Sequence, residues 1–142
     1  MIYLGLDLGE KTLGIARSDS GIFSTPVSTF RFYENHYEDA AKYINKYILD
    51  EGVDVVVLGY PKHMNDDIGI RAQISEAFKV MIEQATQATV VLWDERLSTY
   101  EALSLMTEMG INKDKQRQKK DELAAMIILQ SYLNRKGDYN GR

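Results

Sequence analysis

Residues 1–18 read MIYLGLDLGEKTLGIARS, and this stretch decides how the fold begins. A short apolar run from Ile2 to Leu8 stops at Gly9, and a second run, Leu13 to Ser18, follows the turn. Short apolar segments bounded by glycine-containing turns are typical of β-strands joined in a hairpin. Apart from Asp7, apolar residues nearly fill both faces of the first run, as in a central strand of a covered sheet. The sequence therefore predicts two antiparallel strands at the start, the first of them central.

The remaining chain changes from strand to helical periodicity. A third extended run, 22–30, contains Pro26, which favours a sheet edge or a bulge. The further elements that we expect are a helix ending at Gly52, a strand at 53–58, a helix at 69–84, a strand at 89–93, a short helix from a capping box at Ser98 to Gly110, and a last helix at 121–133. The order β-β-β-α-β-α-β-α-α predicts an α/β fold. In this fold a three-strand antiparallel meander precedes alternating helices and strands, and helices cover both faces of a five-stranded mixed sheet.

Length and composition narrow the class of protein. The 142 residues predict one domain over 1–135 and a frayed tail at 136–142. The absence of cysteine excludes disulfides, zinc fingers, iron–sulfur clusters and thiol catalysis. No apolar run approaches the roughly 20 residues of a membrane helix, and the first residues lack a basic leader, so we expect a cytoplasmic protein without membrane contact. The net charge of −4 gives no overall sign of nucleic-acid binding.

Asp7 needs an explanation, because it lies within an apolar strand. Desolvating an unpaired carboxylate costs several kcal/mol unless it takes up a proton. The ordinary explanations are an exposed strand end or a partner such as Arg17 on the next strand. The functional explanation is a metal or catalytic site. The sequence leaves these alternatives open.

Further acids stand at other element ends. Asp94 and Glu95 follow the strand at 89–93, at the carboxyl end where ligand sites gather in α/β sheets, although one of them could pair with Arg96. Asp121 opens the last helix, where an acid also suits the helix dipole. Asp121 stands four residues before Ala125, so it points along the face of the helix that packs inward. The small side chain of Ala125 would allow this helix to approach the sheet closely.

Together, Asp7, Glu95 and Asp121 predict a metal site, with Asp94 in a supporting position. Three carboxylates that meet at one place repel one another and cannot all stay ionised without a cation. Oxygen ligands without histidine or cysteine suit Mg²⁺ or Mn²⁺ rather than zinc. Two such ions about 3.5–4 Å apart support phosphodiester cleavage. We therefore expect two divalent ions.

Motifs along nearly the whole chain resemble the YqgF/RuvX family of ribonuclease H-like nucleases, which are related to Holliday junction resolvases. The motifs are Leu6-Asp7-Leu8-Gly9, Gly14-Ile15-Ala16, Gly59-Tyr60-Pro61, Asp94-Glu95-Arg96-Leu97-Ser98-Thr99 and the run from Asp121 to Gln130. The resemblance implies a ribonuclease H-like fold with a five-stranded mixed sheet. It places the family's acids at Asp7, Glu95 and Asp121. It also implies maturation of the 5′ end of pre-16S ribosomal RNA, with resolution of DNA junctions as an older proposal.

A basic run precedes Asp121 directly. Its cations are Lys113, Lys115, Arg117, Lys119 and Lys120, and with one acid the run carries a local charge of +4. Such a patch beside a metal site would attract a phosphate backbone, although many charge runs are simply solvated loops. Lys11, Lys62 and Arg96 follow strand ends or turns and are further candidates for phosphate contacts.

Several alternatives remain at this point. The turn at 9–14 resembles the phosphate-binding turn of actin-like ATPases, but those proteins need two such domains. Branched DNA could replace RNA as the substrate, and a junction resolvase would have to act as a dimer; we expect a monomer or a weak homodimer. A non-catalytic nucleic-acid-binding module would bind RNA without metal. Four tyrosines at 33, 37, 43 and 47 could stack on bases, but their spacing favours packing at a helix face.

Overall fold

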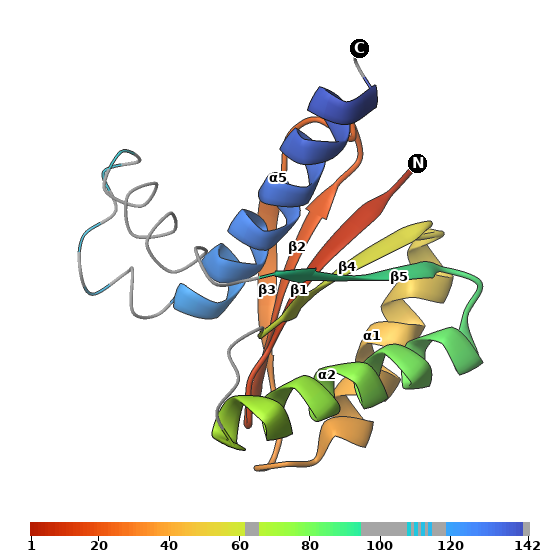
Figure 1. The fold of residues 1–142 in the computed structure, drawn as a ribbon, viewed down its shortest axis with the longest axis vertical. Coiled ribbons are helices and arrows are strands. Elements are labelled where there is room, and N and C mark those ends of the chain that lie inside the picture. The colour runs from red at the N-terminus through yellow and green to blue at the C-terminus, as the bar shows by residue number, and fades with distance from the viewer. Residues whose placement is uncertain are drawn as a thin grey trace.

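The computed structural model describes residues 1–61, 66–94, 108, 110, 112, 114 and 119–140. Its elements are β1 (Tyr3–Leu8), β2 (Thr12–Ser18), β3 (Thr25–Arg31), α1 (Tyr37–Glu51), β4 (Val55–Tyr60), α2 (Asp66–Ala85), β5 (Thr89–Asp94) and α5 (Lys120–Asn140). The strands form one sheet in the order β3-β2-β1-β4-β5 (Figure 1). This arrangement confirms the predicted mixed sheet and the central place of the first strand.

The sheet combines an antiparallel and a parallel half. β1 pairs antiparallel with β2, and β2 pairs antiparallel with β3. On its other side β1 pairs parallel with β4, which pairs parallel with β5. The β2–β3 register shifts between Ile15, opposite Ser28, and Ala16, opposite Pro26. Both predictions made from Pro26 are therefore confirmed, because β3 is an edge strand and carries an irregularity next to the proline.

Helices cover both faces of the sheet, as predicted. α1 and α2 pack on one face, and α5 lies across the other (Figure 1). Alternation along β1 separates the two faces, because successive side chains of a strand point to opposite sides. Leu4, Leu6 and Leu8 belong to the core beneath α1 and α2, whereas Tyr3 belongs to the core beneath α5.

Three boundaries differ from the sequence prediction by three or more residues. β3 begins at Thr25 rather than at residue 22. The Ser20 hydroxyl accepts hydrogen bonds from the backbone N–H groups of Ile22 and Phe23, at 3.0 and 3.1 Å. This turn satisfies the backbone before the strand begins, so the apolar residues 22 and 23 stay exposed.

The two other differences concern helices. α2 begins at Asp66, before the first apolar residue of its periodic pattern, and α5 continues to Asn140, past residue 133. Apolar periodicity marks only the part of a helix that packs, whereas polar turns can extend it at little cost. The end of α1 agrees with the prediction, because Gly52 takes the left-handed conformation with φ 68°.

Two predictions concern other parts of the chain. The short helix expected from Ser98 to Gly110 lies largely outside the described residues. Within the described residues, none of the helices is long and apolar enough to cross a membrane.

Candidate active site

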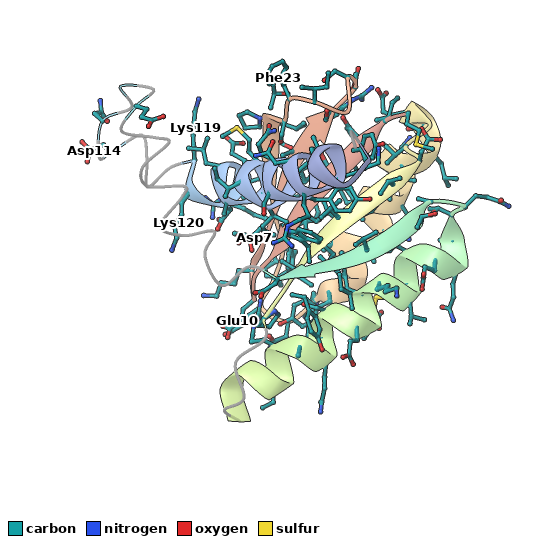
Figure 2. The ribbon with its side chains drawn as sticks, turned by 45° about the horizontal axis from the view of Figure 1, so that its top comes forward. Asp7, Glu10, Phe23, Asp114, Lys119 and Lys120 are labelled. Atoms are coloured by element: carbon teal, nitrogen blue, oxygen red, sulfur yellow. The ribbon has the colours of Figure 1, made fainter. Side chains whose placement is uncertain are left out.

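Asp7 lies near the carboxyl end of the central strand, on the face that α5 covers (Figure 2). Its side chain is half-buried, while its neighbours Leu6 and Leu8 point into the opposite core. Arg17, suggested above as a partner, is directed to the other face. Its guanidinium donates to Asp19, to Glu51 at 2.7 Å and to the hydroxyl of Tyr47 on α1.

These contacts raise the pKa of Arg17, first through the hydrogen bond to Asp19 and then through the bond to Glu51. Arg17 therefore stays charged and is engaged on the α1 side of the sheet. The explanation of Asp7 as the partner of Arg17 is wrong, because the period-two alternation of β1 and β2 places the two side chains on opposite faces.

Two glycines allow α5 to lie directly on the sheet backbone. A Cβ atom built on Gly14 of β2 would stand 2.0 Å from the carbonyl oxygen of Asp121. A Cβ atom on Gly5 of β1 would stand 2.5 Å from the carbonyl oxygen of Ala125. Only residues without a side chain fit at both positions, so the first two turns of α5 contact β2 and β1 at backbone distance.

This contact brings the first turn of α5 beside Asp7. Gly14 is the register partner of Asp7 across the β1–β2 pair, and Cα atoms paired in this way lie about 4.5–5.5 Å apart. Because the backbone of Asp121 touches Gly14 and Asp7 shares the covered face, the two half-buried acids occupy neighbouring positions. The end of the opening strand and the first turn of the last helix therefore lie side by side.

Of the two other predicted acids, Asp94 is among the described residues and Glu95 is not. Trp93 of β5 points toward α5, where its indole N–H donates to the hydroxyl of Ser131 at 3.1 Å. Alternation therefore directs Asp94, the next residue, toward the opposite face. Glu95 lies outside the described residues. Among the described residues, no group of three or more histidine, aspartate or glutamate side chains is close enough to hold a metal ion.

Exposed cations lie at the N-terminal end of α5 and in the turn that follows β1. Lys119 and Lys120 are exposed there, directly before Asp121 (Figure 2). Lys11, in the turn after β1, is exposed as well. The other predicted phosphate contacts lie outside the described residues: Lys62, Arg96, Lys113, Lys115 and Arg117.

Arg71 of α2 supports the carboxyl end of β1, and the sequence reasoning missed it. Its guanidinium donates to the backbone carbonyl of Leu8, the residue after Asp7, and to the hydroxyl of Tyr37 at 3.4 Å. Tyr37 in turn donates to the side chain of Asn35, whose backbone N–H donates to the carbonyl of Glu10. This chain of hydrogen bonds holds the turn that follows Asp7. An arginine within an apolar helical pattern is the signal that could have pointed to it.

Comparisons with known proteins agree with this architecture. The family model RuvX, described as Holliday junction resolvase, matches residues 1–135. Three curated relatives share the name "Putative pre-16S rRNA nuclease". The relative from Onion yellows phytoplasma (strain OY-M) is 48% identical over 92% of this chain and 87% of its own length. Those from Geobacillus sp. (strain WCH70) and Bacillus subtilis (strain 168) are 41% and 38% identical, over 96% and 94% of this chain and 99% and 98% of their own lengths.

Solved structures show the same fold at low sequence identity. The RuvC protein of T. thermophilus in complex with a Holliday junction substrate has a TM-score of 0.63 and 10% identity, and 96% of each chain is covered. The Fowlpox virus resolvase in complex with Holliday junction DNA has a TM-score of 0.52 and 15% identity, with 94% of this chain and 97% of that chain covered. The likenesses confirm the ribonuclease H-like α/β fold predicted from the sequence.

Proposed function

This chain belongs to the RuvX family, and from that premise we propose that it is a metal-dependent nuclease that cleaves phosphodiester bonds in structured RNA. We propose processing of the 5′ end of pre-16S ribosomal RNA, in the cytoplasm, as its role. The support is that relatives at 38–48% identity are named "Putative pre-16S rRNA nuclease". The observation that carries the proposal is the close contact between the first turn of α5 and Gly14, which brings Asp121 beside Asp7.

The donor chemistry of this site fits a hard divalent cation. Asp7 and Asp121 offer carboxylate oxygens, the ligands that Mg²⁺ and Mn²⁺ prefer. Their approach on one face would be repulsive without a cation, because neighbouring carboxylates cannot both stay ionised at low cost. We assign Asp7, Asp121 and Glu95 as the metal ligands and catalytic residues. The direction of Asp94 supports the choice of Glu95 and leaves Asp94 at most a supporting role.

Each part of the chain then has a task. The acids would hold a pair of Mg²⁺ ions, and Gly14 and Gly5 set the depth at which α5 lies. When bound, such ions would make a nucleophile available at neutral pH and stabilise the leaving oxygen of a phosphodiester. The exposed Lys119 and Lys120, with Lys11 on the neighbouring turn, attract the phosphate backbone toward the acids. The proposed phosphate contacts also include the basic residues outside the described part of the chain.

The experiment that tests the proposal compares two substrates and two variants. Wild type and Asp7→Asn are incubated with a precursor-like structured RNA and with a four-way DNA junction, with Mg²⁺ or with EDTA. We expect Mg²⁺-dependent cleavage of the RNA by wild type, and a loss of about a thousandfold or more in Asp7→Asn, because this change removes a ligand charge. Asp50→Asn is the matched control, because the contact that Asp50 makes with the described residues is an exposed ion pair with Lys46.

The outcomes separate the candidate functions. Cleavage of the DNA junction alone would favour junction resolution, which the family description supports, and sedimentation would then have to show a dimer. RNA binding that is sensitive to salt but survives Asp7→Asn, without any cleavage, would favour a non-catalytic module. Full RNA cleavage by Asp7→Asn would refute the assigned site.

A further inference from the structure

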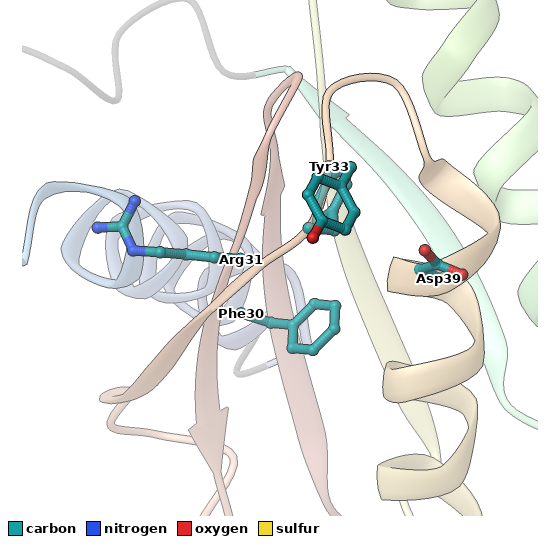
Figure 3. Close-up of a pocket in the computed structure, with 5 residues that line it drawn as sticks. Phe30, Arg31, Tyr33 and Asp39 are labelled. Carbon is teal, nitrogen blue, oxygen red and sulfur yellow. The ribbon is translucent and has the colours of Figure 1, made fainter.

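An open pocket of about 530 Å³ lies where edge strand β3 meets the beginning of α1. It is lined by Phe30, Arg31, Phe32, Tyr33 and Asp39 (Figure 3). Its volume falls within the range of small-ligand sites, roughly 300–1,000 Å³. The lining combines three aromatic rings with one cation and one anion. None of its residues belongs to the proposed metal site.

Two of the lining rings are held by other aromatic residues. Phe30 stacks on Tyr43 of α1, with ring centroids 4.1 Å apart and planes inclined by 13°. Phe32 meets Tyr37 edge to face at 6.0 Å. Aromatic surfaces fixed in this way lose little side-chain entropy when a further ring stacks on them. The pocket therefore offers fixed aromatic surfaces beside which a flat ring can stack.

Tyr33 is the exposed member of this group. Its exposed fraction is 81%, and its ring touches His36 edge to face at 5.9 Å. The sequence predicted that the four tyrosines pack at a helix face. That prediction is right for Tyr37 and Tyr47, which pack against the core, and wrong for Tyr33, which lies in the connection between β3 and α1. A bare tyrosine ring beside a pocket offers a stacking surface.

The pocket opens at the same end of the sheet as the catalytic acids. Arg31 pairs with Thr12 at the start of β2, and the backbone N–H of Phe32 donates to the carbonyl of Lys11 at 2.9 Å. Lys11 lies in the turn that follows β1, close behind Asp7. The pocket itself lies on the α1 side of the sheet, since Phe30 and Phe32 pack against that core, so a nucleic-acid strand reaches it from Asp7 around the turn at Lys11.

The charges of the pocket are separated in space. Asp39 lies on α1 at one side, and Arg31 points away from it, toward the side of α5 (Figure 3). The carboxylate of Asp39 is 59% exposed and 3.7 Å from Nδ1 of His36, so it can accept further hydrogen bonds. This arrangement directs a phosphate toward Arg31 and Lys11, and directs a hydrogen-bond-donating group toward Asp39.

We propose that this pocket binds an unpaired guanine of the RNA substrate, by stacking on Tyr33 and by donation from the base to Asp39; this inference rests on the proposed nuclease function. Unpaired bases of RNA are recognised by aromatic stacking together with hydrogen bonds to their edges. Guanine presents two adjacent N–H donors on its pairing edge, which match the two oxygens of a carboxylate. Adenine and uracil present one donor each there, so Asp39 selects against them.

The test measures binding to a stem with a single-stranded flank, labelled for fluorescence anisotropy, in EDTA so that no cleavage occurs. Flanks carrying G, A, U or C are compared with the blunt stem. We expect wild type to prefer the G flank. Tyr33→Ala should weaken binding of that flank about tenfold, because one base stack is worth roughly this factor, and should leave the blunt stem unchanged. Tyr33→Phe should retain the affinity, and Asp39→Asn should remove the preference for G.

Phe23→Ala is the matched control. Phe23 is an exposed aromatic residue with an exposed fraction of 71%, and it lies at the opposite end of the sheet from Glu10 (Figure 2). Equal binding of the G flank by wild type and Tyr33→Ala would overturn the proposal, as would a loss of the same size in Phe23→Ala. Failure of the proposed function has a different signature. In that case flank binding depends on Tyr33, but wild type cleaves no RNA with Mg²⁺.

Discussion

The two faces of the sheet are built on different principles. The face beneath α1 and α2 is filled with large apolar side chains, among them Leu6, Leu58 and the fully buried Phe78. The face beneath α5 instead has glycine at two contact points with the helix, and it carries the half-buried Asp7. The first face is held by burial of bulky side chains. The second is held at backbone distance, and acids lie at its end.

Because of this difference, the residues that determine the stability of the fold lie mainly on one face, and the candidate catalytic residues lie on the other. Large side chains keep a helix roughly 10 Å from a sheet and leave no room for shared polar groups. Gly14 has no side chain at the place where the backbone of Asp121 lies on the sheet, beside Asp7. We therefore expect changes on the α1/α2 face to alter mainly the free energy of unfolding. Changes on the α5 face should affect cleavage more than stability.

The largest expected effect is on the α1/α2 face. Phe78→Ala removes a fully buried ring and leaves a cavity, so the free energy of unfolding should fall by about 3–5 kcal/mol in urea titrations. Cleavage per folded molecule should persist. Val80→Ala in the same helix, where the side chain is 47% exposed, serves as the control and should stay within about 0.5 kcal/mol of wild type. A loss of cleavage in folded Phe78→Ala would break the separation of the two faces.

A smaller change in stability, with a larger change in activity, is expected for Gly14→Ala. The added methyl group would overlap the carbonyl of Asp121, so α5 must move away, at a cost of about 1–3 kcal/mol. Mg²⁺-dependent cleavage should fall far more than this loss of stability explains. Gly69→Ala in α2 is the matched control, because a Cβ there meets open space, and it should stabilise the fold by about 0.5–1 kcal/mol. Wild-type cleavage by Gly14→Ala would show that the close approach is not needed.

The smallest effect concerns the response to the ion itself. Binding to the folded state alone stabilises it, so Mg²⁺ at ten times its dissociation constant should add about 1.4 kcal/mol. For a chain of this length the melting temperature should then rise by about 4 °C. The rise should persist in Phe78→Ala and largely vanish in Asp7→Asn, with sodium chloride at matched ionic strength as the control. An undiminished rise in Asp7→Asn would place the stabilising ion elsewhere.

Local pattern was sufficient to predict the order of the described elements. Glycine turns, Pro26 and the change from period two to period 3.6 led to the correct sheet, because these signals act within a few residues. Boundaries were less certain where polar residues extend a helix, as at Asn140, or where a hydroxyl holds a turn, as at Ser20. The exposed position of Tyr33 was missed, because helical spacing was assumed across a loop.

The candidate site also has features that the sequence predicted and features that only the tertiary structure decided. The sequence alone identified Asp7 as a carboxylate that needs an explanation, because it stands between Leu6 and Leu8 in an otherwise apolar run. Its role relative to Arg17 was decided by tertiary structure, because alternation in the paired strands sends the two side chains to opposite faces. The contact of Asp121 with Gly14 also required the fold. Such a contact depends on how closely the helix lies on the sheet. Two residues that are far apart in the chain set this distance together.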